Sequence, residues 1–466
     1  MKLNRRTITF FIYLLITVGV TYFTPRTVSS IWYIILLILY YKSSDEVFWL
    51  AFFITISDGF IGFFSTYSTI ITLIPGLPGI DMPQVYILIS LFKVYSRKMK
   101  LVTYYGNWTK LLMAYICLLV VVGIINGLKG ELNIYFRVVK LILPLLLVYT
   151  IPRLITNIDE FKKVFDLIFI VFILGFAAQI FTVFTGFSPT SNFKLPEKIV
   201  DTEEVRENFR SFYNPAITLI SLFASLFFLS IKQDRYFPKV YLYIIIGMTF
   251  FMSFLSASRG WIICTGLIIV LFFIVVEKGK NLGRISLLFL LLVTVGMTSK
   301  KIRDQTIFAV ERFMTLEALT GGDQTANGTL ARLDERSPKV MAAWAENPIF
   351  GWGYSNVFLK NTDGHVGNQN ILMHAGFIGF SLLMLFLLFV NVTMLFDYRS
   401  FAYKSKYKET CLVFIVFFIG YFILHSTSGQ QIGFSGFPQN IIPQAIFLGM
   451  SSIVHKLGQR KSIVVK

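Results

Sequence analysis

The residues best suited to chemistry lie in one polar stretch, residues 329–376, of an otherwise apolar sequence. The stretch contains Arg332, the turn-forming segment 348–353 (PIFGWG) and His365 in close succession. An imidazole gains or loses a proton near neutral pH, so His365 is suited to activating a hydroxyl group or to hydrogen-bonding a substrate. We therefore expect the functional groups to concentrate here.

Arg259 interrupts an apolar sequence at SASRGW. An unpaired Arg at the centre of a bilayer costs about 2.5 to 3.5 kcal/mol on insertion scales, and less near an interface. Arg259 is therefore expected to face a cavity or an anion. The alternative is an Arg that caps the turn between two helices and extends to lipid headgroups.

Arg137 and Lys140 are three residues apart in an apolar segment, so both project from one helical face. Two cations on one face within a membrane favour a polyanion such as a diphosphate. The alternative is extension to the interface, or pairing with a carboxylate such as Asp58 or Glu131. For Lys140 we favour this alternative.

Arg210 follows three carboxylates, Glu203, Glu204 and Glu207. A local ion pair would explain Arg210 equally well, although exposed pairs contribute only about 0 to 1 kcal/mol. Its role stays open between substrate binding and local pairing.

The sequence contains none of the usual metal or nucleotide motifs. A metal site needs three or four suitably spaced ligands, and there is no Cys pair, no HExxH and no DxD. There is also no Walker A segment, no GxGxxG after a strand and no GxSxG elbow. We expect neither a metal nor a cofactor.

The composition indicates the class of protein to which these residues belong. The 466 residues are 55% hydrophobic and 15% charged, with a mean hydropathy of +0.68, which is typical of an all-α polytopic membrane protein. The net charge of +18 lies in short loops between apolar segments, so we exclude nucleic-acid binding. The three cysteines lie in apolar segments and are expected to be core residues, not disulfides.

A membrane span requires roughly 20 apolar residues, which gives about 12 to 14 transmembrane helices in a single domain, residues 1–466. Candidate spans lie near residues 8–23, 31–41, 47–64, 69–92, 110–126, 133–150, 164–186, 212–231, 239–257, 260–276, 284–298, 368–396, 411–427 and 438–455.

Every second loop is basic, which predicts that both termini are cytoplasmic. The outer face then receives a large loop, residues 299–367, with short helices, and two smaller ones, residues 187–211 and 428–437. Arg259 lies at an outer helix junction in this topology.

Within the large loop, residues 338–346 are expected to form a short helix that lies on the membrane. Ser337 is a plausible N-cap, and Pro338 fits the first helical position. The segment 348–353 after it is expected to turn so that its backbone comes close to a neighbour.

Four motifs, in order, resemble those of the O-antigen ligase and O-antigen polymerase superfamily of bacterial membrane proteins. They cover mainly residues 207–380 and read NFRSFYNPA, SASRGW, ARLDERSPKVMAAWAENPIFGWGYSN and GHVGNQNILMHAGFIG. The more N-terminal sequence matches only as a series of spans.

The resemblance implies a helical glycosyltransferase that uses undecaprenyl-diphosphate-linked glycans on the outer face of the bacterial cytoplasmic (inner) membrane. Arg259 and Arg332 match arginines that hold the diphosphate, and His365 matches the essential His of the family. Val366 follows this His where many relatives have Asn, and the next Asn is Asn368. The substrate-binding residues are expected to include Arg210, Arg137, Lys140, Arg336, Asn368 and Tyr354.

These observations favour a polysaccharide polymerase that moves a growing glycan, with inversion and without metal, onto a new lipid-linked repeat unit. Its partners would be the lipid-linked oligosaccharide, membrane lipid and a polysaccharide chain-length regulator. One alternative is a ligase that transfers the glycan to lipid A core or another acceptor. An alternative of another class is a flippase for lipid-linked oligosaccharides, although transporters commonly place ionisable residues near the membrane midplane.

Overall fold

A computed structural model describes most of the chain. The described residues are 5–64, 69–72, 79–97, 103–128, 130, 132–185, 215–231, 236–281, scattered positions from 283 to 299, 300–320, 335–364, 366–401, 405–429, 431 and 438–464. Arg210, Arg332 and His365 lie outside them, as do the loop 187–211 and most of the predicted span 284–298.

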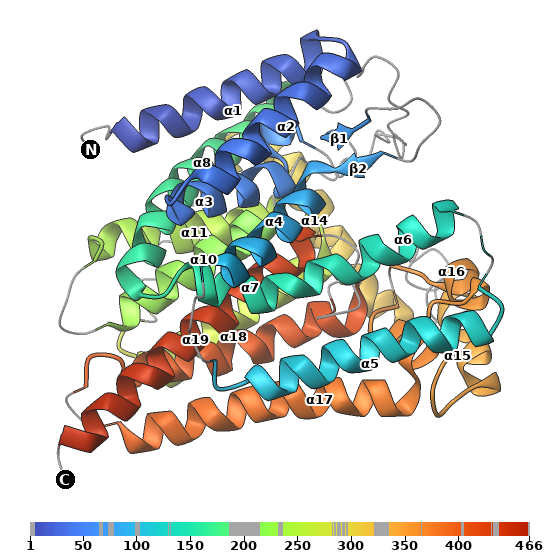
Figure 1. Ribbon diagram of the computed structural model, residues 1–466. Coiled ribbons are helices and arrows are strands. Elements are labelled where there is room, and N and C mark those ends of the chain that lie inside the picture. Colours follow the sequence, from blue (N-terminus) through green and yellow to red (C-terminus); the bar gives the residue numbers. More distant parts are fainter. Residues whose placement is uncertain are drawn as a thin grey trace.

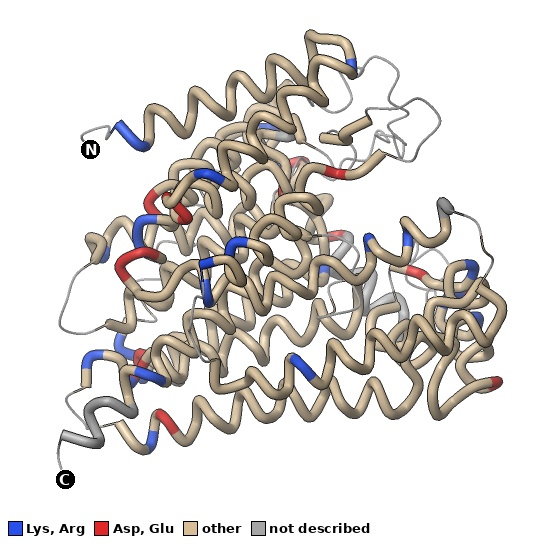
Figure 2. The backbone as a smooth tube through the Cα atoms, viewed as in Figure 1, with Lys and Arg blue, Asp and Glu red and all other residues tan. Residues whose placement is uncertain are grey.

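The described chain is a bundle of helices in which α1 begins, and α19 ends, at the same end (Figure 1). We call this the terminal end. The opposite end, which we call the distal end, has β1, β2, α15 and α16 (Figure 1). Lys, Arg, Asp and Glu lie mostly towards these two ends, and the middle of the bundle contains few of them (Figure 2).

The first half of the chain forms one small hairpin and a series of helices. They are α1 (Arg5–Phe23), α2 (Arg26–Lys42), α3 (Glu46–Asp58), η1 (Phe60–Gly62), β1 (Ile70–Ile71), β2 (Ile80–Asp81), α4 (Met82–Ser96), α5 (Gly106–Ile125), α6 (Leu132–Ile142), η2 (Leu143–Leu145), α7 (Leu146–Leu154), α8 (Ile158–Thr185) and α10 (Pro215–Ser230). The strands pair antiparallel, Ile70 with Asp81 and Ile71 with Ile80.

The second half is helical where it is described. Its elements are α11 (Lys239–Leu255), α12 (Arg259–Leu271), η3 (Phe272–Val276), α14 (Lys300–Thr320), α15 (Ser337–Glu346), α16 (Asn356–Asn361), α17 (Asn368–Ser400), α18 (Lys408–Thr427) and α19 (Pro438–Val464).

The membrane class predicted from composition agrees with these helices. Eight segments of the described chain are long and apolar enough to cross a membrane, and α10 and α11 are shorter apolar helices. The all-α class is therefore confirmed at this level. The count of about 12 to 14 spans stays a prediction.

Two predicted elements differ from the structure. The expected span 69–92 is instead the β1–β2 hairpin followed by α4, and the sequence between the strands contains Pro75 and Pro78, which are unfavourable inside a helix. The large loop also contains α14, whose 21 residues exceed the short helices expected there.

The centre of the bundle is formed by α10, α18 and α19. Beyond its first residue, every side chain of α10 is buried, as expected for a helix that is apolar on all faces. Phe223 of α10, Phe417 of α18 and Phe447 of α19 form a ring cluster with centroids 4.4 to 5.0 Å apart. This packing fixes α18, whose distal end supports the candidate site.

Candidate functional site

The distal end of α18 lies beside two of the described candidate residues, Arg259 and Asn368. Arg259 is the first residue of α12 and is partly exposed. The next residue, Gly260, faces α18: a Cβ there would lie 3.4 Å from Leu424 and 3.8 Å from the Thr427 hydroxyl. These distances place Arg259, the preceding residue, beside the last turn of α18.

Asn368, at the start of α17, is joined to the same turn of α18. Its Oδ1 lies 2.8 Å from Nδ1 of His425, and its Nδ2 donates to Ser426 Oγ at 3.1 Å. Because an amide oxygen only accepts, this arrangement requires His425 to donate from Nδ1. Both ends of its amide therefore join two helices, and the expected contact of Asn368 with substrate stays a prediction.

Gly367 makes this close approach possible. Its φ is +57°, and a Cβ would overlap the carbonyl of Ser426. A side chain at Gly367 would therefore be both strained and in collision with α18. The backbone just after position 365 is fixed in this way against the end of α18.

The segment before position 365 is fixed to α17. The Asp363 backbone N–H donates to Asn370 Oδ1 at 3.0 Å, and Asn370 Nδ2 donates back to the Asp363 carbonyl. The Asp363 carboxylate also lies 3.6 Å from Nε of Arg336, in a partly exposed pair. Arg336 is thus held near the segment that flanks His365.

The turn 348–353 is inserted into a break in α17. At Gly376 the backbone is not helical (φ +63°, ψ −172°), which leaves helix donors and acceptors without their normal partners. Trp352 N donates to Met373 O at 2.9 Å and Gly353 N to His374 O at 2.8 Å, while Phe377 N donates to Pro348 O at 2.8 Å. The turn therefore satisfies both sides of the break.

The glycines of this turn are needed for the same contacts. Gly351 (φ +69°) lies against the backbone of His374 and Gly376, and Gly353 (φ +57°) lies against Leu119 of α5. The expectation that the segment approaches a neighbouring backbone closely is confirmed, and the neighbours are α17 and α5.

The helix expected at residues 338–346 is confirmed as α15, and its location on a membrane stays a prediction. Val340 and Ala343 are buried, and α15 packs against α17 and α16. The Ser337 side chain makes no capping hydrogen bond; Ser337 already lies in the first turn of the helix. The face of α15 formed by Val340 and Ala343 therefore packs against protein.

Arg137 and Lys140 have separate partners. Lys140 Nζ lies 3.4 Å from the carboxylate of Asp81, and Arg137 Nη2 lies 3.5 Å from the Leu359 carbonyl in α16. Pairing of Lys140 with a carboxylate is confirmed, and the partner is Asp81, not Asp58; Glu131 lies outside the described residues. Asp58 instead accepts from Ile217 N at the start of α10, at 2.8 Å.

Tyr354 does not present its ring to a ligand. It is 1% exposed, and its ring packs against Phe358 and His374, with centroids 6.1 and 4.3 Å away. Burial raises the pKa of its hydroxyl well above the ordinary value. The expected contact with substrate is therefore replaced by a packing role at the break in α17.

The positioning roles of His425, Ser426 and Asn370 were missed from sequence. His425 is 1% exposed. Its partner Asn368 is 57 positions away in the chain, and no sequence pattern joins the two.

Within the described ranges, no group of three His, Cys, Asp or Glu side chains could hold a metal ion. The described candidate cations Arg259 and Arg336 are guanidinium groups, whose planar donors suit a phosphate or carboxylate. The chemistry offered at the distal end is therefore anion binding beside a segment held at both ends.

Comparison with known protein families gives no match, and no curated protein is similar in sequence to this chain.

Proposed function

We propose that this protein is a polysaccharide polymerase that lengthens an O-antigen, capsular or exopolysaccharide chain on a diphosphate lipid carrier. The observation that supports it is the placement of Arg259 and Arg336, from separate elements, at the distal end of the bundle. Between them lies the segment that flanks position 365, joined to α17 and α18 through Asn370, Asn368 and Gly367.

The arginines suit the leaving group of this reaction. As the bond between the anomeric carbon and the diphosphate oxygen breaks, negative charge grows on the diphosphate. Fixed guanidinium groups stabilise that charge, and their donors match phosphate oxygens in pairs. In this proposal Arg259, Arg332 and Arg336 bind the diphosphate, while Arg210 and Arg137 contact the lipid-linked substrates.

His365 suits the acceptor side. The hydroxyl at the non-reducing end of the new repeat unit attacks the anomeric carbon, and its proton passes to the imidazole as the new glycosidic bond forms. Attack opposite the departing diphosphate inverts the anomeric configuration. The released carrier diphosphate and the lengthened lipid-linked glycan account for every bond made and broken.

The proposal places the site at the outer face of a bacterial cytoplasmic membrane, with both termini inside. Two lipid-linked substrates would reach it from the same leaflet, which suits a site at the end of the bundle. A chain-length regulator would be a further partner.

Glycan synthesis by the purified full-length protein tests the proposal. The substrate is its cognate lipid-diphosphate repeat unit, and the product is separated by length. We expect a ladder of longer glycans, which is lost in His365→Ala and Arg332→Ala and strongly reduced in Arg259→Ala. Arg399→Ala, an exposed Arg at the other end of α17, should leave the ladder unchanged.

Other outcomes would favour the alternatives. A folded preparation that makes no ladder, but transfers preformed glycan to lipid A core or another acceptor, would be a ligase. Movement of the repeat unit across liposomes without a longer product would indicate a flippase. Loss of the ladder in chelator, with recovery on adding a divalent metal, would contradict the metal-independent mechanism.

A further inference from the structure

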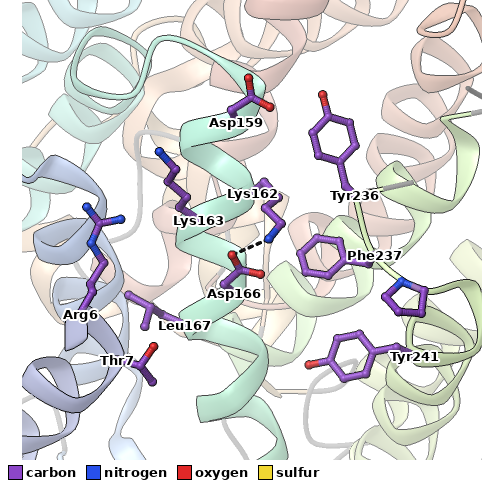
Figure 3. Close-up of a pocket in the computed structure, with 11 residues that line it drawn as sticks. Arg6, Thr7, Asp159, Lys162, Lys163, Asp166, Leu167, Tyr236, Phe237 and Tyr241 are labelled. Atoms are coloured by element: carbon purple, nitrogen blue, oxygen red, sulfur yellow. Dashed lines mark hydrogen bonds and ion pairs between the residues drawn. The ribbon is translucent and has the colours of Figure 1, made fainter. Parts of the chain in front are cut away.

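A cavity of about 770 Å³ opens at the terminal end, on the opposite side of the bundle from the candidate site. Figure 3 shows α8 as its floor, with α1 on one side and the start of α11 on the other. Its volume is within the range of small-ligand sites, about 300 to 1,000 Å³. The cavity is therefore large enough for a ligand and is separate from the proposed reaction.

Three cations line this cavity. Arg6 extends from α1, and Lys162 and Lys163 extend from the first turns of α8 (Figure 3). Two carboxylates, Asp159 and Asp166, also line it. The charge balance of the lining residues is thus positive by one.

The three cations differ in whether they already form an ion pair with a carboxylate. Lys162 Nζ lies 2.7 Å from Asp166, and Arg6 uses Nε and Nη2 on Asp45 at 3.0 Å. Lys163 is exposed and has no carboxylate partner within the described part of the chain. Lys163 is therefore the cation best placed to attract an anion, with Arg6 as its neighbour.

Aromatic residues close the other side of the cavity. Tyr236, Phe237 and Tyr241 face α8 across it (Figure 3), and Lys162 lies 5.0 Å from the centre of the Phe237 ring. Tyrosine is enriched where a membrane meets water, because the ring is apolar and the hydroxyl is polar. The lining thus combines cations with the side chains of a membrane interface.

Apolar surface continues from the cavity along α8. Ile170 and Leu174 lie seven and eleven residues after Lys163, so all three share one face of the helix. Ile173 and Leu174 are 36% and 37% exposed. A ligand with a phosphate at Lys163 and a hydrocarbon chain would contact both parts of this face, whereas a soluble phosphate would leave the apolar part uncovered.

We propose that this cavity binds the headgroup of an anionic phospholipid from the leaflet at the terminal end. The phosphate contacts Lys163 and Arg6, a hydroxyl of the headgroup reaches Tyr236 or Tyr241, and an acyl chain lies along Ile170 and Leu174. Lysine and arginine near a membrane surface attract anionic lipids in the same way. The site does not depend on the polymerase proposal.

Native mass spectrometry of the full-length protein in detergent tests this site. The protein is titrated with phosphatidylglycerol, and with phosphatidylcholine of the same acyl chains. We expect wild type to retain the anionic lipid preferentially, Lys163→Gln to reduce that preference about fivefold, and Lys163→Arg to preserve it. Equal retention of the two lipids by wild type, or an unchanged preference in Lys163→Gln, would overturn the proposal.

Two controls separate this site from general effects of charge. Lys280→Gln removes an exposed Lys that follows α12 and lies outside the cavity, and it should leave the preference intact. A loss equal to that of Lys163→Gln would indicate diffuse attraction and overturn the site.

Glycerol 1-phosphate at the concentration of the lipid should not displace the bound lipid. Displacement would show a site for a soluble phosphate, contrary to the proposal. Matched thermal unfolding of the variants establishes that each is folded.

Discussion

Nδ1 of His425 lies 2.8 Å from Oδ1 of Asn368, and this contact joins the last turn of α18 to the first turn of α17. Both helices are held in the bundle by apolar packing, and Val366, next to position 365, is also buried. The polar links of Asn368 and Asn370 add directional contacts on either side of position 365.

Removing the link should reduce activity more than stability. Asn368→Ala leaves His425 Nδ1 and the Ser426 hydroxyl without their partner, which costs about 1 to 3 kcal/mol for a buried group. We expect glycan synthesis to fall about tenfold or more, because the flanking segment loses its fixed position. The measurement is the rate of ladder formation at matched amounts of folded protein.

Asn391→Ala is the matched control for that variant. Asn391 lies on the same helix and donates to Leu387 O one turn away, so it joins no second helix. Its replacement should leave synthesis within about twofold of wild type. Similar losses in Asn391→Ala and Asn368→Ala would show that the α17–α18 link has no special role.

Because the turn 348–353 packs tightly against the break in α17, we expect a single methyl group added at Gly351 to lower stability strongly. Gly351→Ala places a Cβ against the backbone of His374 and Gly376 at a φ of +69°. Left-handed strain together with overpacking should lower the free energy of unfolding by at least about 2 kcal/mol. Thermal unfolding of the purified protein measures this loss as a lower midpoint.

Gly127→Ala separates the two causes. Gly127 has a φ of +82°, but no atom lies within 4 Å of a Cβ there. Its replacement should cost only the backbone strain, about 1 to 2 kcal/mol. If Gly127→Ala and Gly351→Ala were equally destabilising, the close packing of the turn against α17 would contribute nothing.

Arg336 and Asp363 form an ion pair, and we expect Arg336 to contribute more to glycan synthesis than Asp363. Their side chains are 40% and 25% exposed, so the pair itself contributes little stability. If Arg336 binds the substrate diphosphate, Arg336→Gln should reduce synthesis about tenfold, mainly through a higher KM, while Asp363→Asn retains most activity. Equal losses in the two variants would indicate that Arg336 acts only through Asp363.

The pair of Lys140 with Asp81 predicts a dependence on pH. Burial raises the pKa of Asp81, and the nearby Lys140 partly offsets that rise. Because the net shift is upward, the stability that Asp81 contributes is present below its ordinary pKa and is lost as pH rises through its pKa in the folded protein. Lys140→Met removes the offset and makes ionised Asp81 more costly.

Thermal unfolding at about pH 5 and about pH 8 measures this effect. The destabilisation of Lys140→Met relative to wild type should be larger at the higher pH, and the added change Asp81→Asn should remove that difference. If Lys140→Met were destabilised relative to wild type by the same amount at both pH values, Asp81 would not titrate as proposed.

The sequence by itself determined the class of this protein and several local elements. Apolar segments near the length of a bilayer predicted the long helices, because hydrocarbon requires internally hydrogen-bonded backbone. Pro338 and Pro348 bounded a short helix near residues 338–346, and the glycines of PIFGWG indicated close backbone contact. These predictions depend only on neighbouring residues.

The tertiary structure decided which residues meet. Asn368 joins His425 and Ser426 of α18, and Tyr354 is buried at the break in α17. Lys140 forms an ion pair with Asp81, a carboxylate 59 positions earlier. Asp81 lies in a hairpin that had been expected to be part of a span. Such pairings are set by how the helices pack, and hydropathy and motif spacing carry no information about which polar side chains that packing brings within hydrogen-bonding distance.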